Sequence, residues 1–203
     1  MIVGTLPPPR FTTQNFKEGD VDFCYGSRDG QLWPILERIF DLELQYETTD
    51  KAVAQRKNFL VKEGIGICDM VASAKRQKVD ASDIGMQQVE LRDLISILEK
   101  HPSVATLLFT GGNSKNGPEY FFRKVARRYK LQLKTLSKKS PRQYEFILPQ
   151  SRRAIQTVSL IAPSGAANMA VGSISSYKER KAVDPSYTTI DFRVEQYAPF
   201  FKE

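Results

Sequence analysis

The chain has 203 residues, of which 41% are hydrophobic and 26% are charged, a composition typical of a folded globular protein rather than a disordered one. No stretch approaches the roughly 18 consecutive apolar residues that a membrane-spanning helix requires. The first residues also lack the basic and apolar segments of a secretory signal. We therefore expect a cytoplasmic protein that does not engage a membrane.

The chain contains only two cysteines and one histidine, which limits its metal and redox chemistry. Cys24, Cys68 and His101 are too few for a zinc ribbon, a four-cysteine iron–sulfur cluster or a histidine-rich metal site. We expect no disulfide framework, no metal and no cofactor. His101 precedes Pro102 where a helix should end, and a polar or positive group is favourable there. This favours a structural role for His101 over membership of a Ser-His-Asp triad.

Positive charge is concentrated in the second half of the sequence. Residues 1–100 carry 13 Lys and Arg against 16 Asp and Glu, whereas residues 101–203 carry 17 against 7. Ten basic residues and a single acid lie between Lys115 and Arg142. Such a segment is either a solvated basic face or a surface for a polyanion such as nucleic acid.

Apolar spacing predicts the elements of the first half of the chain. Residues 2–5 form a short strand that ends at the prolines of residues 7–9. Apolar side chains at helical spacing predict a helix over residues 32–40, and capping signals predict another over residues 50–62. Residues 65–68 form a short apolar run between glycines, which indicates a buried strand.

The second half continues the alternation. Leu91, Leu94, Ile95 and Leu98 indicate a helix before a buried strand at residues 104–109. A basic helix follows, with Phe122, Val125, Ala126 and Tyr129 on its inner face.

Two further strands are expected at residues 144–148 and 158–162, and residues 189–201 form a final helix or an extended tail. Strands that alternate with helices predict a single α/β domain over residues 1–203, a three-layer α/β/α sandwich with a short, mostly parallel central sheet. Ligands of such sheets bind outside the carboxyl ends of the strands. The loops after Thr5, Cys68, Phe109 and Ala162 are therefore the places to search for a site.

Three motifs, the first of them in two parts, carry a resemblance to a known family. Residues 3–9 read Val-Gly-Thr-Leu-Pro-Pro-Pro, and residues 22–33 read Asp-Phe-Cys-Tyr-Gly-Ser-Arg-Asp-Gly-Gln-Leu-Trp. Residues 64–73 read Gly-Ile-Gly-Ile-Cys-Asp-Met-Val-Ala-Ser, and residues 162–168 read Ala-Pro-Ser-Gly-Ala-Ala-Asn. In this order they resemble the motifs of the uracil-DNA glycosylase superfamily, and most closely its hypoxanthine-DNA glycosylase branch.

The resemblance implies a metal-independent, monofunctional enzyme of base excision repair that flips a deaminated base, uracil or hypoxanthine, out of DNA. It places Gly4, Thr5, Tyr25 and Trp33 around that base, with the two aromatic rings as stacking platforms. Trp33 is equally well explained as a core anchor of the first helix.

Asp69 matches the position at which the family reads the hydrogen-bonding edge of the base. An ionised carboxylate only accepts hydrogen bonds and so favours a base that offers N–H donors. The structural alternative for Asp69 is a helix cap after the strand.

The chain departs from the family at two positions. Gly30 stands where the nearest relatives carry an asparagine that orients the hydrolytic water, so this role passes to Asp29. Ala162 stands where other branches carry a His or Asn that stabilises the leaving base, and Asn168 is the nearest substitute.

The remaining expected contacts are to the DNA backbone. Ser164 and Gly165 resemble a phosphate clamp, and their alternative is a simple turn. The other residues expected to bind DNA are Arg28, Gly112, Asn113, Lys115, Arg123 and Arg127.

Two other classes of function remain open. A degenerate superfamily member would bind DNA or a nucleotide without catalysis, as the departures at Gly30 and Ala162 allow. A doubly wound protein that binds a phosphorylated metabolite is less favoured, because residues 111–117 are glycine-rich but lack the P-loop and dinucleotide patterns. In either case we expect a monomer.

Overall fold

The computed structural model describes residues 1–76 and 83–201. By their internal contacts these residues form two compact units. Unit 1 comprises residues 1–13 and 63–160, and unit 2 comprises residues 14–62 and 161–203. Each unit is therefore built from two separate stretches of the chain, although the sequence predicts one domain.

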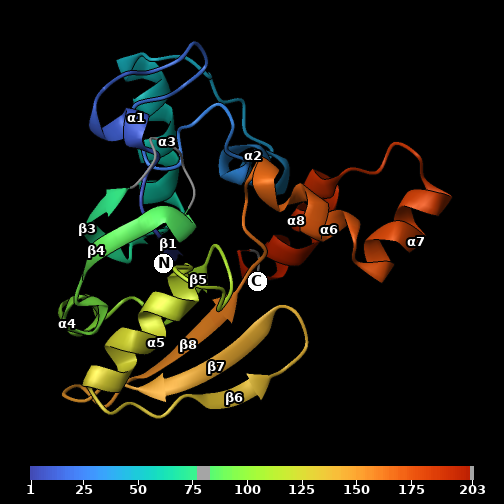
Figure 1. Cartoon of the computed structure of the whole chain (residues 1–203). Coiled ribbons are helices and arrows are strands. Elements are labelled where there is room, and N and C mark those ends of the chain that lie inside the picture. The colour runs from blue at the N-terminus through green and yellow to red at the C-terminus, as the bar shows by residue number, and fades with distance from the viewer. Residues whose placement is uncertain (77–82, 202–203) are drawn as a thin grey trace. The chain divides into compact units, whose positions relative to one another are not determined.

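Unit 1 contains a six-stranded sheet in the order β2-β1-β5-β8-β7-β6 (Figure 1). Its first four strands, β2 (Ile67–Asp69), β1 (Ile2–Gly4), β5 (Thr106–Phe109) and β8 (Ala154–Ser159), are parallel. β7 (Arg142–Ile147) and β6 (Lys134–Ser137) continue the sheet in antiparallel pairing. The predicted α/β class with a mostly parallel sheet is confirmed.

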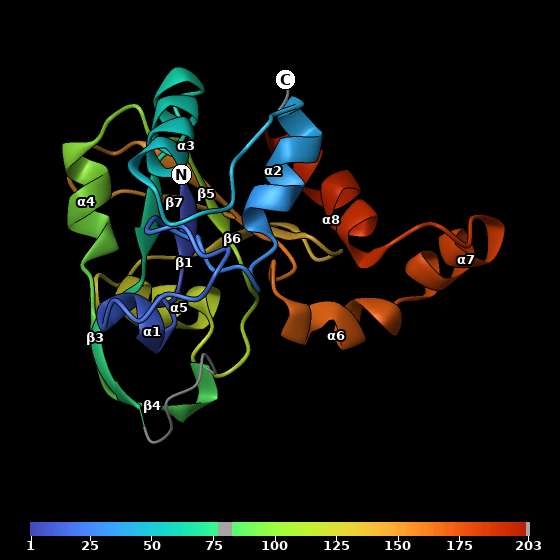
Figure 2. The same cartoon turned by 90° about the horizontal axis from the view of Figure 1, so that it is seen from above.

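Helices and a hairpin cover one face of this sheet. α5 (Pro118–Arg128) buries its predicted inner face, with Phe122 against Phe109 and Phe146 at ring separations of 5.1 and 5.3 Å (Figure 1). α4 (Leu94–Lys100) and the antiparallel strands β3 (Val71–Arg76) and β4 (Met86–Leu91) pack against the same core, and Figure 2 shows them from above. The short helix α1 (Pro9–Thr12) and a 3₁₀ turn at Asp83–Gly85 complete unit 1.

Several predicted boundaries move in the structure. Leu91 ends β4 instead of beginning a helix, because β4 continues until two residues before the cap of α4 at Asp93. β8 covers Ala154–Ser159, whereas the sequence predicts a strand over 158–162. Residues 160–162 are not part of the strand, although Leu160 is buried. Burial outside the sheet therefore explains why the apolar run continues past the end of β8.

Unit 2 is helical among its described residues. It contains α2 (Leu32–Phe40), α3 (Asp50–Lys62), α6 (Asn168–Gly172), α7 (Ser175–Val183) and α8 (Thr189–Tyr197), with 3₁₀ turns at Gly165–Ala167 and Ala198–Phe200. α2 packs against α8, and Arg38 forms an ion pair with Asp191. Asp191 also closes a capping box with Thr188 at the start of α8. The predicted bounds of α3 are confirmed, and no described helix is long and apolar enough to span a bilayer.

Candidate functional site

The topology of the sheet singles out one position at its carboxyl edge. β1 lies between β2 and β5, and the chain passes from β1 to β2 on one side and from β5 to β8 on the other. The ends of β1 and β5 therefore flank the point where the strand order reverses, which is where open α/β sheets bind ligands. Thr5 and Thr110 follow these two strands and are both buried.

Asp69 lies at this edge, one strand away. It ends β2 and pairs in register with Gly4 of β1. Burial raises the pKa of the Asp69 carboxyl to about 6, against the attraction of the Arg92 guanidinium. The capping alternative for Asp69 is wrong, because the next element is the strand β3 and not a helix.

A second carboxyl group, which the sequence does not single out, lies near Asp69. Burial raises the pKa of Asp83 to about 6, and the negative charge of Asp69 adds to this increase. A hydrogen bond from the Thr5 hydroxyl and the charge of Arg76 act in the opposite direction. The main-chain carbonyl of Asp83 accepts a 2.8 Å hydrogen bond from Asn116 Nδ2, which ties this turn to the glycine-rich loop after β5.

The arrangement suits the transfer or sharing of protons with a polar ligand. Two carboxyl groups that titrate near pH 6 can each accept a hydrogen bond when ionised and donate one when protonated. Perturbed acids at a ligand-binding edge are also typical of functional sites. Unit 1 also has a hollow of about 390 Å³, whose lining includes Arg76, the residue whose charge acts on Asp83. It is lined by Leu6, Pro7, Pro9, Thr12, Ala72, Ser73, Ala74 and Arg76.

Within unit 2 the structure brings two of the resembling segments together. Gly30 forms an isolated antiparallel bridge with Ser164, and the backbone N–H of Gln31 donates to the carbonyl of Pro163 at 2.9 Å. The segment with Arg28, Asp29 and Gly30 thus lies directly against the segment that leads into Gly165. Arg28 and Asp29 are both exposed.

Arg193, which the sequence does not single out, holds the second of these segments. Its side chain is fully buried. It donates from Nε to the carbonyl of Ala162 at 3.0 Å, from Nη1 to Asn168 Oδ1 at 2.9 Å and from Nη2 to the carbonyl of Ser164 at 3.3 Å. The amide oxygen of Asn168 is therefore held within the fold, whereas its expected part in stabilising a leaving base would use the amide N–H donors and stays a prediction. A lone arginine in a mixed helix gives no sequence signal for such a role.

Trp33 is a core residue, so its expected role as a stacking platform is corrected. Its side chain is 1% exposed, and its indole N–H donates to the carbonyl of Cys24 at 2.8 Å. The ring packs against Phe23 and Phe59, and the Arg56 guanidinium lies 5.2 Å from its centre. These neighbours cover the ring and keep it from stacking on a base. Tyr25 is half-buried, in the left-handed backbone region at φ +57°.

The basic segment divides into engaged and exposed residues. Arg123 contacts the buried Glu119 at 2.8 Å and stacks on Tyr144, and its expected contact with DNA stays a prediction. Asn113, Lys115 and Arg127 are exposed, as a surface for a polyanion requires. Gly112 lies in the loop after β5.

The predicted site residues divide between the two units. Unit 1 holds Gly4, Thr5, Asp69, Gly112, Asn113, Lys115, Arg123 and Arg127, and unit 2 holds Tyr25, Arg28, Asp29, Gly30, Trp33, Ser164, Gly165 and Asn168. Across residues 1–76 and 83–201, no group of three His, Cys, Asp or Glu side chains is placed to hold a metal ion. No family model, curated protein or solved structure matches the chain.

Proposed function

We propose that the protein is a DNA glycosylase of the uracil-DNA glycosylase type, with the three-layer architecture of that superfamily, which hydrolyses the N-glycosidic bond of uracil or hypoxanthine in DNA. The observation that carries the proposal is the position of Asp69, at the carboxyl end of β2 and in register with Gly4 of β1. This is the edge at which the resemblance expects the base to be read. The proposal includes DNA as the partner of a monomer that needs no metal or cofactor.

Asp69 is suited to recognise a deaminated base. Uracil and hypoxanthine each present a ring N–H beside a carbonyl, and an ionised carboxylate accepts a hydrogen bond from that N–H. Its pKa of about 6 makes Asp69 mostly ionised at neutral pH. In the proposed role, Asp69 recognises a deaminated base by the ring N–H donor that deamination creates.

The proposed reaction has one chemical step. Water attacks the anomeric carbon of the deoxyribose, and the bond from that carbon to the base nitrogen breaks. The base leaves with the bonding electrons and takes up a proton, so that an abasic site and a free base are formed. By the resemblance, Asp29 is the residue that orients the water, since Gly30 has no side chain.

A specific observation supports a second candidate, a member of the superfamily that binds DNA or a nucleotide without cleaving it. Asn168, the substitute for the group absent at Ala162, is held by Arg193 and Thr189. A protein that lacks both the water-orienting asparagine and the His or Asn at the position of Ala162 would retain binding alone.

A cleavage assay separates the two candidates. Duplexes that carry a single uracil, hypoxanthine or xanthine are incubated with the protein, and alkaline strand scission reports abasic sites. We expect cleavage of the uracil or hypoxanthine duplex, and its loss in an Asp69→Ala variant that retains the wild-type melting profile. Absence of cleavage on every duplex, with retained DNA binding, would support the second candidate.

A further inference from the structure

A buried carboxylate organises two arginines at the edge of the sheet in unit 1. Glu119, in the first turn of α5, is 2% exposed. Its Oε1 accepts from Arg123 Nε at 2.9 Å, and its Oε2 accepts from Arg142 Nη2 and from Ser159 Oγ, both at 2.7 Å. Burial alone would raise the pKa of Glu119, but these hydrogen bonds outweigh it and lower the pKa. Glu119 is therefore a buried carboxylate held by two arginines and Ser159.

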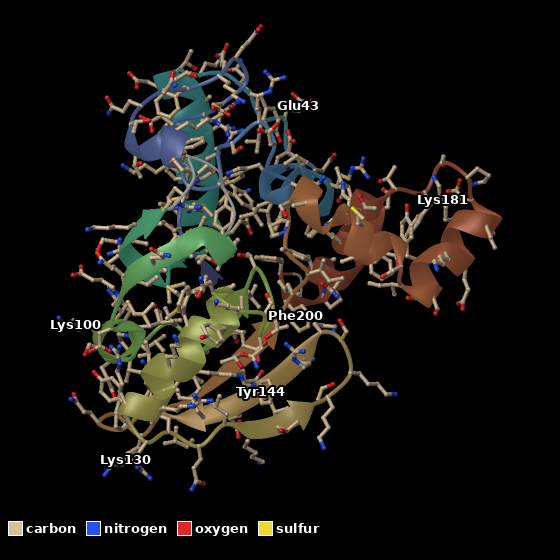
Figure 3. The ribbon with its side chains drawn as sticks, viewed as in Figure 1. Glu43, Lys100, Lys130, Tyr144, Lys181 and Phe200 are labelled. Atoms are coloured by element: carbon tan, nitrogen blue, oxygen red, sulfur yellow. The ribbon has the colours of Figure 1, made fainter. Side chains whose placement is uncertain are left out.

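The cluster contains one negative and two positive charges, so one positive charge is left over. Arg123 is the more covered of the two arginines, with 24% of its side chain exposed and its guanidinium 4.5 Å from the ring centre of Tyr144. Tyr144 lies on β7 and is labelled in Figure 3. The side chain of Arg142 is 40% exposed. The surplus charge is thus presented to solvent through Arg142.

Arg142 lies at the carboxyl edge of the parallel strands. It begins β7 and pairs with Ser159, the last residue of β8. A Cβ atom at Gly112, in the loop after β5, would lie 3.2 Å from Arg142 Nη2. The absence of a side chain at residue 112 therefore leaves room for the guanidinium beside the backbone of this loop, which also carries the exposed Lys115.

The guanidinium has capacity for a ligand. It has five N–H donors in a planar fork, and the acceptors identified within the protein are the Glu119 carboxylate and the Tyr144 hydroxyl. Such a fork matches two oxygens of a phosphate, and the buried carboxylate fixes its orientation.

We propose that Arg142 binds one phosphodiester of the DNA backbone, with Glu119 as the positioning residue and Gly112 as the residue that leaves room for it. This inference rests on the proposed function for the identity of the ligand as DNA. It shifts the specific backbone contact of the basic segment from Arg123 to Arg142.

The test is the salt dependence of binding to an undamaged duplex, which requires no cleavage. Arg142→Gln should make the slope of log affinity against log salt shallower by about 0.9, the value for one phosphate that is no longer neutralised. The matched control is Arg152→Gln, which removes the same charge from an exposed residue in the turn between β7 and β8. The control should retain the wild-type slope, and equal slopes for the two variants would overturn the proposal.

Glu119→Gln distinguishes positioning from net charge. This variant makes the protein more positive, so simple charge attraction predicts tighter binding. The positioning role predicts weaker binding, because Arg142 loses its ionic anchor. Gly112→Ala gives a second variant that leaves every charge in place, and it should weaken binding because the added methyl displaces Arg142. Melting profiles confirm that each variant is folded, and unchanged affinity in Gly112→Ala together with tighter binding by Glu119→Gln would refute the positioning role.

The two proposals fail in different ways. If the wild type binds DNA with the expected dependence on Arg142 but cleaves no duplex, the glycosylase proposal fails and the phosphate contact stands. If it cleaves a damaged duplex and Arg142→Gln retains the wild-type slope, the phosphate contact fails alone. Loss of inorganic phosphate binding in Arg142→Gln with an unchanged DNA slope would assign the site to a small anion and overturn the DNA contact.

Discussion

Gly30 and Ser164 form an antiparallel bridge between segments from opposite ends of the sequence. A Cβ at residue 30 would lie 3.0 Å from the carbonyl oxygen of Ser27 and 3.3 Å from that of Tyr25. The glycine therefore fits a tight turn against the Pro-Ser segment. Its identity has a packing reason that is independent of catalysis.

Restoring the family's asparagine at this position should have two separable effects. Gly30→Asn and the control Gly30→Ala should both lower the stability of unit 2 by about 1–3 kcal/mol, because each places a Cβ against backbone oxygens. Only Gly30→Asn should increase single-turnover cleavage, since only the amide can orient water. The fluorescence of Trp33, the single tryptophan of the chain, measures the stability of this unit. Equal activity in both variants would remove residue 30 from the reaction.

Asp29→Asn should decrease single-turnover cleavage by about 10²–10⁴, the usual effect of removing a positioned general base. DNA affinity should stay equal or increase, because a negative charge is lost. Asp22→Asn, at another exposed residue of the same loop, is the matched control and should leave the rate unchanged. Full activity in Asp29→Asn would exclude it as the base.

Asp69→Asn should change which base is accepted. The amide keeps the shape of the carboxyl group but replaces one acceptor oxygen with an NH2 donor. A ring N–H that faces this NH2 group finds no acceptor. Sites built on buried polar contacts discriminate by about 10⁴ or more, so the preference for uracil or hypoxanthine over the undeaminated bases cytosine and adenine should fall strongly. Cleavage rates on duplexes with the deaminated and the undeaminated bases give this preference, and an unchanged preference would place base recognition elsewhere.

The same substitution should increase stability at neutral pH. Asp69 has a folded-state pKa of about 6, above the ordinary aspartate value of 3.8. Between these values the folded protein binds more protons than the unfolded chain, so stability falls as the pH rises through this window. Asp69→Asn removes this loss, and we expect a gain of about 1–3 kcal/mol at pH 7.5 with little gain at pH 4. Urea unfolding at the two pH values measures it, and a larger gain at pH 4 would contradict the assignment.

The basic residues in and just after α5 should have different roles, some in DNA binding and one in stability. Arg127→Ala with Lys130→Ala removes two exposed charges and should make the salt slope of DNA binding shallower by about 0.9 for each phosphate that these side chains neutralise. Arg123→Ala should instead lower the stability of unit 1, because Glu119 loses its partner one turn away. A change of slope in Arg123→Ala without loss of stability would return that residue to the DNA surface.

Local signals in the sequence predict much of the framework. α3 follows from an aspartate at its start and a glycine after its end, and α5 follows from apolar residues at helical spacing. β3 and β4 escape prediction because many of their side chains are exposed and carry no clear alternation. Asp69 can be anticipated because it directly follows a predicted strand, where ligands of parallel sheets bind. In the structure it pairs in register with Gly4.

The contacts that complete the candidate site depend on distant parts of the chain. Nothing near Asp83 indicates that its carboxyl group meets the Thr5 hydroxyl. Likewise, nothing near Arg193 indicates that it gathers the carbonyls of Ala162 and Ser164. Burial of Trp33 is set by partners such as Phe59, from a different helix. Periodicity identifies which face of an element is buried, but it does not identify the partner.

The discontinuous composition of the two units has a consequence for the order in which they complete during synthesis. Unit 1 has all of its residues once Leu160 has left the ribosome, whereas residues 14–62 must wait for residues 161–203. The buried Arg193 and its acceptors belong to this later stretch. A nascent chain arrested after Leu160 should therefore protect the sheet from proteolysis while residues 14–62, in which α2 still lacks its packing partner α8, remain open to cleavage.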